Sequence, residues 1–328
     1  MISIDDTLPN VIKAKAEHYK VINTYLRRSH LQKNTPVTDF IKDNLDDLIN
    51  GKPDELEVLN KQFYDSIPRF TANGYQSYLV ALEKNRHRRT WAERRLIRRY
   101  NKLRAKLYKI INYEDWFISS PKLYAYQLAE NLDRTTCTYC NRLYTNTVIT
   151  EDGAKVMRPQ FDHWFPKSKF PLLALSFYNL IPSCSVCNSS TKGDTLFELN
   201  SHYHPYDKGI LDKFTFSYDY EKSLDTYTVK IAHNTLDVKA KKTFDDLNLA
   251  TIYNAHTSEL KDLITIKKKY TKNYIDTIQK AYPSSGLSYD ETYRLAFGTE
   301  YKEENFHQRP FSKFKKDILA ELKIIPSK

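Results

Sequence analysis

The chain has 328 residues, 41% of them hydrophobic, and a formal net charge of +11. This much apolar material can bury a substantial core and argues against an intrinsically disordered protein. Only 7 glycines occur, about a third of the number expected from an average usage of ~7%. Because glycine supplies many tight turns, this scarcity predicts long helices and argues against a many-stranded sandwich. The basic charge suits a polyanion such as nucleic acid, although a lysine-rich solvated surface would give the same charge without such a partner.

The amino-terminal residues, M-I-S-I-D-D-T-L-P-N, contain no basic segment followed by an apolar one, so they do not predict a signal peptide. The most apolar run, from Phe170 to Pro182, includes Ser176 and Asn179 and is too short and too polar to span a membrane. We therefore expect a cytoplasmic protein with no membrane partner. In that compartment paired cysteines are more often metal ligands than disulfides.

Residues 1–130 predict a helical N-terminal region. Prolines interrupt helices, so breaks are expected at Pro36, at the segment 51–53 and at Pro68. Residues 39–57 are rich in Asp and Glu, which is typical of a solvated helical face.

Residues 84–110 predict a strongly basic amphipathic helix within this region. Leu96, Tyr100 and Leu103 recur at helical spacing, so one stripe can face a core. The stretch 84–109 carries twelve Lys or Arg against one Glu, and an anionic partner would relieve the repulsion among these charges. The alternative is that the helix pairs internally with the acidic residues 39–57. We expect nucleic-acid contacts from Arg88, Arg89, Arg95, Arg98 and Arg99.

Residues 131–210 are predicted to form a central unit, and residues 211–328 a small β hairpin followed by a helical C-terminal region. In the central unit, strands are expected at 143–149 and 154–161, joined by a turn at 151–153. The later hairpin is expected from 214–220 and 226–232. Helices are expected over 238–282 and 311–325, with a break at 283–286. The predicted fold class is α+β, mainly helical, with helical regions on both sides of the central unit.

All four cysteines occur in two C-x-x-C pairs, Cys137 with Cys140 and Cys184 with Cys187. Each pair can place two thiolates on one ion, and two pairs complete a tetrahedral shell with no open position. We therefore expect one structural Zn²⁺ per chain. The 43 residues between the pairs exceed the spacing of a single zinc finger, so the ion would hold a whole inserted motif together. Two redox pairs or four inert thiols are the alternatives, but no thioredoxin-like βαβ context accompanies the cysteines.

Polar residues suited to phosphodiester chemistry lie between and just after the cysteine pairs. His163 has an ordinary pKa near neutrality, which fits a general base that deprotonates water. Asp162 is a hard oxygen ligand suited to Mg²⁺, and the amide oxygen of Asn188 can supply another. Lys192 is predicted to lie on the same helical face as Asn188 and to contact a phosphate as a point charge. Taken singly, each has a simpler interpretation: polar surface, a helix cap at Asn188, or a turn at Asn179.

The segment F-D-H-W-F-P-K-S, together with Y-N-L-I-P-S-C-S-V-C-N-S-S-T-K-G-D, resembles HNH endonucleases of the zinc-bound ββα-metal type. The resemblance covers about residues 137–210. It implies His163 as the general base and Asp162 and Asn188 as ligands of a catalytic Mg²⁺ or Mn²⁺. It also implies that Asn179 orients the loop between the two strands. Because the third motif position is Asn188 and not a histidine, a Mg²⁺-like ion is favoured over Zn²⁺ or Ni²⁺ at that site.

The downstream segment H-Y-H-P-Y-D, with His202 and His204, resembles bacterial HNH proteins of the PtuB-like kind that are associated with retron or Septu systems. This likeness implies an anti-phage effector that works with a partner ATPase from the same operon. Without the likeness, His202 and His204 are ordinary loop histidines.

The function predicted from the sequence is a metal-dependent HNH endonuclease that hydrolyses nucleic-acid phosphodiesters, with DNA favoured over RNA. The alternative is a nucleic-acid-binding or scaffolding protein whose HNH unit is degenerate. The presence of Asp162, His163 and Asn188 together favours the nuclease, because a protein that only binds has no need of all three.

Overall fold

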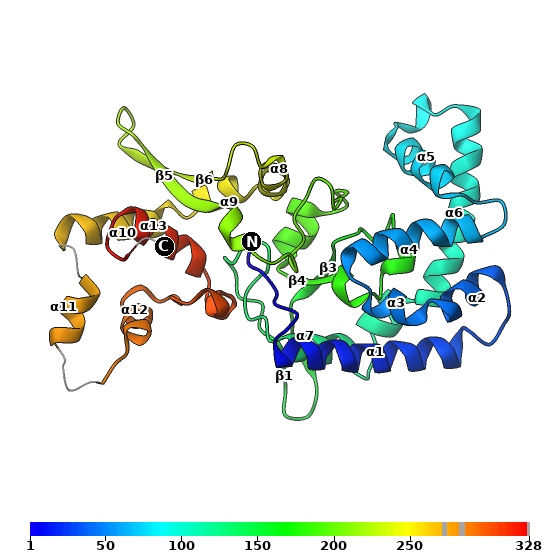
Figure 1. Cartoon of the computed structure of the whole chain (residues 1–328), viewed down its shortest axis with the longest axis horizontal. Coiled ribbons are helices and arrows are strands. Elements are labelled where there is room, and N and C mark those ends of the chain that lie inside the picture. The colour runs from blue at the N-terminus through cyan, green and yellow to red at the C-terminus, as the bar shows by residue number, and fades with distance from the viewer. Residues whose placement is uncertain (271–273, 282–285, 327–328) are drawn as a thin grey trace.

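The computed structural model describes residues 1–270, 274–281 and 286–326. The described residues are mainly helical with three short antiparallel sheets, which confirms the predicted helical content and is compatible with the α+β class. The N-terminal helices lie at one end of an elongated molecule, the C-terminal helices at the other, and β3 and β4 between them (Figure 1). Apart from Gly286, the predicted break at 283–286 lies outside the described residues. Within the described part of the chain, no helix combines the length and apolar character needed to cross a membrane.

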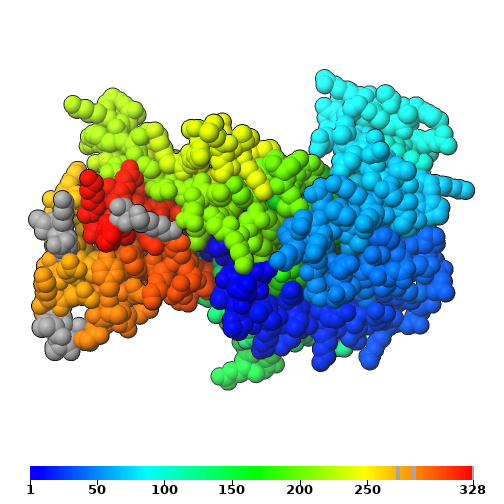
Figure 2. Space-filling model, viewed as in Figure 1, coloured from blue at the N-terminus to red at the C-terminus, as the bar shows by residue number. Residues whose placement is uncertain are grey.

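Seven α-helices build the N-terminal region. They are α1 (Pro9–Ser29), α2 (Pro36–Asp43), α3 (Leu45–Asn50), α4 (Pro53–Ser66), α5 (Ala72–Glu83), α6 (Trp91–Ile111) and α7 (Tyr124–Leu132), with a π-helical turn over Tyr113–Ile118 between α6 and α7. Proline occupies the start of α1, α2 and α4, where its missing N–H has no helical partner to lose. α1 packs along α7, and α5 packs against α6. The space-filling view shows the α5–α6 region standing out from the body (Figure 2).

The predicted basic helix begins at Trp91 and not at residue 84. The Thr90 hydroxyl accepts a hydrogen bond of 3.2 Å from the Glu93 N–H, and the Glu93 carboxylate accepts one of 2.8 Å from the Thr90 N–H. This reciprocal cap satisfies two N–H groups that a helix start otherwise leaves free. Residues Arg86–Arg88 form a separate 3₁₀ turn. The sequence T-W-A-E carries this start signal, which marks the boundary more sharply than hydrophobic spacing does.

The central unit contains two short strand pairs. They are β1 (Val148–Ile149) with β2 (Lys155–Met157), and β3 (Gln160–His163) with β4 (Leu180–Ser183). The prediction of strands at 143–149 and 154–161 is correct only in part, because the paired segments are shorter and Phe161 belongs to β3. Pro159 has no N–H to donate and separates β2 from β3. The register of β3 on β4 places Asp162 opposite Ile181 and His163 opposite Leu180.

The C-terminal region contains the predicted hairpin, β5 (Thr215–Glu221) paired with β6 (Thr226–Ala232). Its helices are α8 (Val238–Asp246), α9 (Leu249–Asn254), α10 (Thr257–Lys269), α11 (Tyr274–Ala281), α12 (Tyr289–Phe297) and α13 (Ser312–Glu321). α13 packs on β5, and α9 and α10 pack on β6. The rings of Phe216, Tyr253 and Phe314 lie 4.4 to 5.4 Å apart between centroids and form the centre of this core.

Candidate functional site

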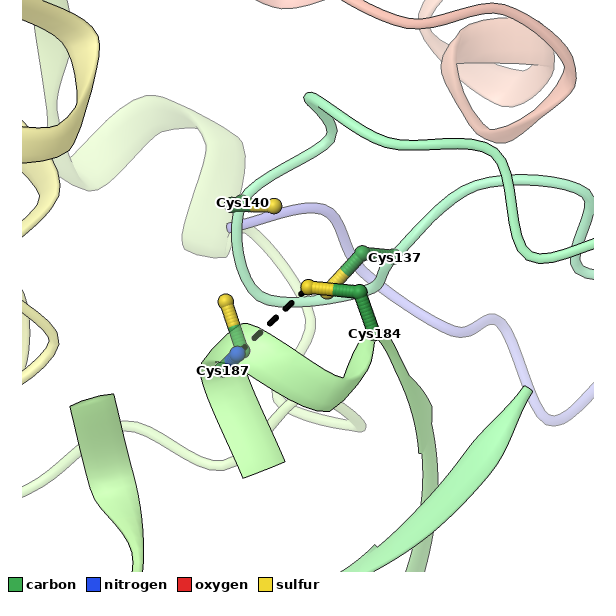
Figure 3. A group of neighbouring side chains, drawn as sticks. All are labelled: Cys137, Cys140, Cys184 and Cys187. Atoms are coloured by element: carbon green, nitrogen blue, oxygen red, sulfur yellow. Dashed lines mark hydrogen bonds between the residues drawn. The ribbon is translucent and has the colours of Figure 1, made fainter. Parts of the chain in front are cut away.

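The four cysteine side chains lie together in the interior of the central unit (Figure 3). Their sulfur atoms all lie within 4.8 Å of one another. In a tetrahedral zinc site with Zn–S bonds of ~2.3 Å, the sulfur atoms are ~3.8 Å apart. Four thiols this close could therefore hold a metal ion such as zinc after only a small contraction. Among the residues that the structure describes, they are the one group of three or more His, Cys, Asp or Glu side chains close enough to share an ion.

Local backbone bonds shape both cysteine pairs. The chain turns after Cys137, where the Asn141 N–H donates to the Cys137 carbonyl at 2.8 Å and Asn141 adopts the left-handed region with φ of 49°. Asparagine tolerates this conformation better than most residues. Cys184 follows β4 directly, and the Cys187 N–H donates to its sulfur at 3.4 Å. A bond of 3.2 Å from the Thr138 N–H to the Pro182 carbonyl joins the first pair to β4.

The C-terminal region contacts the first cysteine pair from its other side. The Tyr253 hydroxyl donates to the Cys140 carbonyl at 2.6 Å. The Phe311 N–H donates to the Asn141 carbonyl at 2.6 Å, and the Asn141 side chain donates to the Phe306 carbonyl at 2.8 Å. The first pair therefore lies between β4 and the C-terminal helices.

A pocket of about 310 Å³ lies at the ends of β3 and of the helical turn that follows β4. Asp162 and His163, at the end of β3, line it together with Asn188 from the turn Val186–Lys192. Three of the four residues predicted for catalysis thus line one pocket, and the fourth, Asn179, does not. Lys167 and Asp194 also line the pocket and were not among the predicted site residues. Both belong to the segments that carry the HNH resemblance, F-P-K-S and T-K-G-D, which is the signal that could have identified them.

His163 is buried, and its Nε2 lies 3.0 Å from the Ala174 carbonyl oxygen. A carbonyl can only accept, so Nε2 carries the proton and Nδ1 keeps its lone pair. The ring packs on that of Tyr113 in a T-shaped arrangement with a centroid distance of 4.5 Å. Burial lowers the pKa of His163 to about 4, and the hydrogen bond to Ala174 opposes this shift only in part. The imidazole is therefore neutral at pH 7 and oriented, as a proton acceptor should be.

Asp162 is also buried, and two side chains bind its carboxylate. The Tyr139 hydroxyl donates to Oδ2 at 2.6 Å. Lys192 Nζ lies 3.2 Å from Oδ2 and 3.4 Å from Oδ1. Burial raises the pKa of Asp162, while Lys192 and Tyr139 pull it down. Tyr139, inside C-T-Y-C, was not predicted to take part in the site.

Lys192 does not reach the surface, where we predicted it would contact a phosphate. Its side chain is fully buried, donates to the His163 carbonyl at 2.8 Å and lies 5.1 Å from the centroid of the Phe197 ring. A buried carboxylate is costly unless a cation pairs with it, and Lys192 is the cation that the turn after β4 brings to Asp162. The structure therefore gives Lys192 a contact that differs from the predicted one.

The two predicted asparagines hold different parts of the site. Asn179 is fully buried, and its Oδ1 accepts from the Phe165 N–H at 2.7 Å while its Nδ2 donates to the Leu173 carbonyl at 2.9 Å. It thereby fixes the loop between β3 and β4, which is where a loop-orienting residue belongs. Asn188 is half-buried, and its Nδ2 donates to Gln160 Oε1 at 2.7 Å. That bond uses the amide nitrogen, so the amide oxygen remains available to coordinate a metal ion.

His202 and His204 are neither loop-surface residues nor part of the pocket lining. His202 stacks on Phe197 at 4.1 Å and its Nε2 lies 2.9 Å from Asp246 Oδ2. His204 packs against Trp164 at 4.8 Å. Both lie in the irregular segment that precedes β5, as expected for loop histidines, but their side chains are fully buried in the core.

The predicted nucleic-acid contacts on α6 are exposed. Arg95, Arg98 and Arg99 face solvent, as does Arg88 in the preceding turn. Arg89 is only partly exposed, because its guanidinium donates to the carbonyls of Leu82 and Lys84. In the described residues, no ion pair joins 84–110 to the acidic stretch 39–57, so the alternative of internal pairing finds no support.

The C-terminal half of α6 is attached to the rim of the pocket. The Arg104 guanidinium donates to the Ser168 carbonyl at 2.9 Å, and the Tyr108 hydroxyl donates to the Lys167 carbonyl at 3.0 Å. The C-terminal half of the basic helix therefore lies next to residues at the rim of the pocket.

No known protein family, curated protein or solved structure matches this chain. What the chain does is therefore inferred from the geometry of this site.

Proposed function

We propose that this protein is a metal-dependent HNH-type endonuclease that hydrolyses phosphodiester bonds in nucleic acid, with DNA favoured over RNA. The observation that carries the proposal is the state of His163. Its ring is oriented by the Ala174 carbonyl, neutral at pH 7, and placed in one pocket with the oxygen donors Asp162 and Asn188.

In the proposed reaction His163 accepts the proton of the attacking water at Nδ1. General bases positioned in this way contribute roughly 10²–10⁴-fold to a rate. The Ala174 carbonyl keeps the ring in the correct tautomer and becomes a better partner once the ring is protonated. Asn179 maintains this geometry because it fixes the loop that carries both Leu173 and Ala174.

Asp162 and Asn188 would hold a Mg²⁺ or Mn²⁺ ion. Both of these ions favour oxygen ligands. The donor atoms fit this role. Asp162 Oδ1 accepts a long hydrogen bond of 3.4 Å from Lys192, and the amide oxygen of Asn188 is not used by the bond to Gln160. Asp194, on the same pocket, is a further oxygen donor. When bound, such an ion supplies charge stabilisation of the phosphate and of the leaving oxygen.

The four cysteines would hold the structural Zn²⁺. A shell of four thiolates leaves no position for water or substrate, so this ion has no part in the chemistry. Its proposed role is to fix the first cysteine pair against the end of β4, beside the pocket.

A second candidate is a nucleic-acid-binding protein without cleavage activity. The buried Asp162–Lys192 pair favours it, because a cation already lies against the carboxylate that would hold the metal. On this alternative the protein keeps the four-cysteine centre and the basic helix and only binds nucleic acid.

A cleavage assay separates the two candidates. Wild type, His163→Ala and the exposed control His87→Ala would be incubated with Mg²⁺ or Mn²⁺ on plasmid, linear duplex, single-stranded DNA and RNA. We expect cleavage by wild type and by the control, and a loss of roughly 10²-fold or more for His163→Ala. Equal cleavage by wild type and His163→Ala would exclude the general base. Binding by all three without cleavage would select the second candidate.

From the resemblance alone, we extend the proposal to a role in bacterial anti-phage defence together with a partner ATPase. Co-expression with the product of the neighbouring gene tests this extension. Stable co-purification and a higher cleavage rate of the complex are expected, and the absence of any association would contradict it.

A further inference from the structure

A groove of about 980 Å³ lies between α5 and α6, near the start of the basic helix. Its lining includes Val80 from α5, Arg69 from the loop before α5, and Trp91, Arg95 and Arg99 from α6. Both helices belong to the part of the molecule that stands out from the body (Figure 2). They approach closely at Gly74, where any side chain would collide with the Tyr100 hydroxyl.

Trp91 is the unusual member of this lining. It is 73% exposed, whereas Trp164 is fully buried and Trp116 is half-buried. The Arg95 guanidinium lies 5.5 Å from its ring centroid. A large flat ring that faces solvent beside arginines is the arrangement on which proteins stack unpaired bases.

The groove also carries positive charge that no carboxylate of the described residues neutralises. In the described part of the chain, Arg69, Arg95 and Arg99 form no ion pair with a carboxylate. Glu93, which also lines the groove, is already bound by Lys84 and by the Thr90 N–H. The lining therefore offers an exposed aromatic ring together with three guanidinium groups that are not bound to a carboxylate.

We propose that this groove binds an unpaired stretch of nucleic acid, with a base stacked on Trp91 and neighbouring phosphates held by Arg69, Arg95 and Arg99. The proposal rests on the proposed nuclease function and adds the class of substrate: single strands, or duplexes with an unpaired end. Paired bases in a duplex do not present the free face that stacking on a tryptophan requires. A purely apolar partner would leave the three arginines without anions.

The groove and the rim of the pocket both contact α6, at different points along the helix. Trp91 and Arg104 lie thirteen residues apart on α6, which corresponds to roughly 20 Å along the helix axis. Arg104 is bonded to Ser168, at the rim of the pocket. A single strand with its unpaired end in the groove therefore has to span a distance of this order to bring a phosphodiester near His163.

The test measures binding without cleavage, in full-length protein that carries His163→Ala. Labelled single-stranded DNA, single-stranded RNA and blunt duplex DNA of equal length would be titrated by fluorescence anisotropy, and tryptophan quenching would be followed in parallel. We expect single strands to quench the exposed Trp91. Trp91→Ala should weaken single-strand binding about 10-fold, and Trp91→Phe should retain most of it. Tyr270→Ala, an exposed aromatic on another part of the chain, is the matched control and should change nothing.

Equal single-strand affinity with and without Trp91 would overturn the proposal, as would equal weakening for blunt duplex. The DNA and RNA arms show which sugar is preferred. Failure of this proposal is distinguishable from failure of the nuclease proposal. If wild type cleaves single strands and Trp91→Ala cleaves them equally well, only the groove proposal is rejected. If single strands bind at Trp91 but no variant cleaves them, only the nuclease proposal is rejected.

Discussion

Tyr139 donates a hydrogen bond of 2.6 Å to Asp162, and so connects the first cysteine pair directly to the pocket. Tyr139 stands between Cys137 and Cys140, so a change in the position of that pair also moves the partner of the carboxylate. The four-cysteine centre and the pocket are therefore adjacent sites that Tyr139 connects.

The Tyr139→Phe variant removes this hydrogen bond and keeps the ring. A hydrogen bond to a charged group contributes roughly 1.5–3 kcal/mol, so we expect Asp162 to be less well oriented and cleavage to fall by about 10-fold or more. Zinc content should stay the same, because no ligand changes. Metal analysis and initial cleavage rates check both points. Tyr144→Phe, an exposed tyrosine near the same cysteine pair, is the control, and an equal loss in both variants would contradict the assigned role.

Cys184→Ser removes one ligand of the proposed zinc. Purified wild type should contain close to one Zn²⁺ per chain, and the variant should lose the ion and unfold at a markedly lower temperature, because structural zinc contributes directly to folding free energy. Metal analysis and thermal unfolding measure this. The neighbouring exposed residue supplies the control, since Ser185→Ala should keep both the ion and the stability. A metal-free wild type of full stability would refute the zinc site.

Lys192→Met leaves the buried carboxylate of Asp162 without its cation. Breaking a buried pair by removing one partner typically costs about 3–5 kcal/mol, so the free energy of unfolding should fall strongly in urea titrations. The double variant Lys192→Met with Asp162→Asn should recover part of that loss, because no charge is left unpaired. Lys208→Met, on the surface, should be nearly neutral. If the double variant is no more stable than Lys192→Met alone, the unpaired charge of Asp162 is not the cause of the lost stability.

Acid sensitivity is expected from His18, which is buried against Phe117 and Phe177 and bonded through Nε2 to the Leu175 carbonyl at 2.8 Å. Burial lowers the pKa of His18 from its ordinary 6.5 to about 4. Below pH 6.5 the unfolded chain therefore binds a proton at His18 that the folded chain does not. The stability contribution is complete above pH 6.5 and is lost as the pH falls toward 4, on the order of 3 kcal/mol in total.

Urea unfolding between pH 7 and pH 4.5 measures this dependence. His18→Gln, which does not titrate, should show a shallower decline over that range than wild type. The exposed His87→Gln should follow wild type. Parallel curves for wild type and His18→Gln would assign the acid sensitivity to other groups.

Local signals account for what the sequence alone could predict. Proline geometry predicts the helix starts at Pro36 and Pro53, strand alternation predicts the β5–β6 hairpin, and C-x-x-C spacing predicts the closeness of the two cysteines within each pair. All of these signals act over a few residues. The pairs recognised by motif, such as Asp162 with His163, are also adjacent in the chain.

Contacts over longer separations could not be predicted in this way. Tyr139 and Lys192 lie 23 and 30 residues from Asp162, and only the pairing of β3 with β4 and the burial of the carboxylate bring them to it. The inward direction of Lys192 follows from the cost of an unpaired buried charge, which depends on tertiary packing. The exposure of Trp91 likewise depends on how α5 and α6 pack.

The bonds from Tyr253 and Phe311 to the first cysteine pair have a consequence for how the molecule unfolds. Residues 137–141 form hydrogen bonds with β4 on one side and with the C-terminal region on the other. With metal bound, the two ends of the molecule should melt as one cooperative unit. Without metal, residues 137–141 should be less well ordered, and the N- and C-terminal helical regions should then unfold independently. Calorimetry should show the single unfolding transition broaden or split into two.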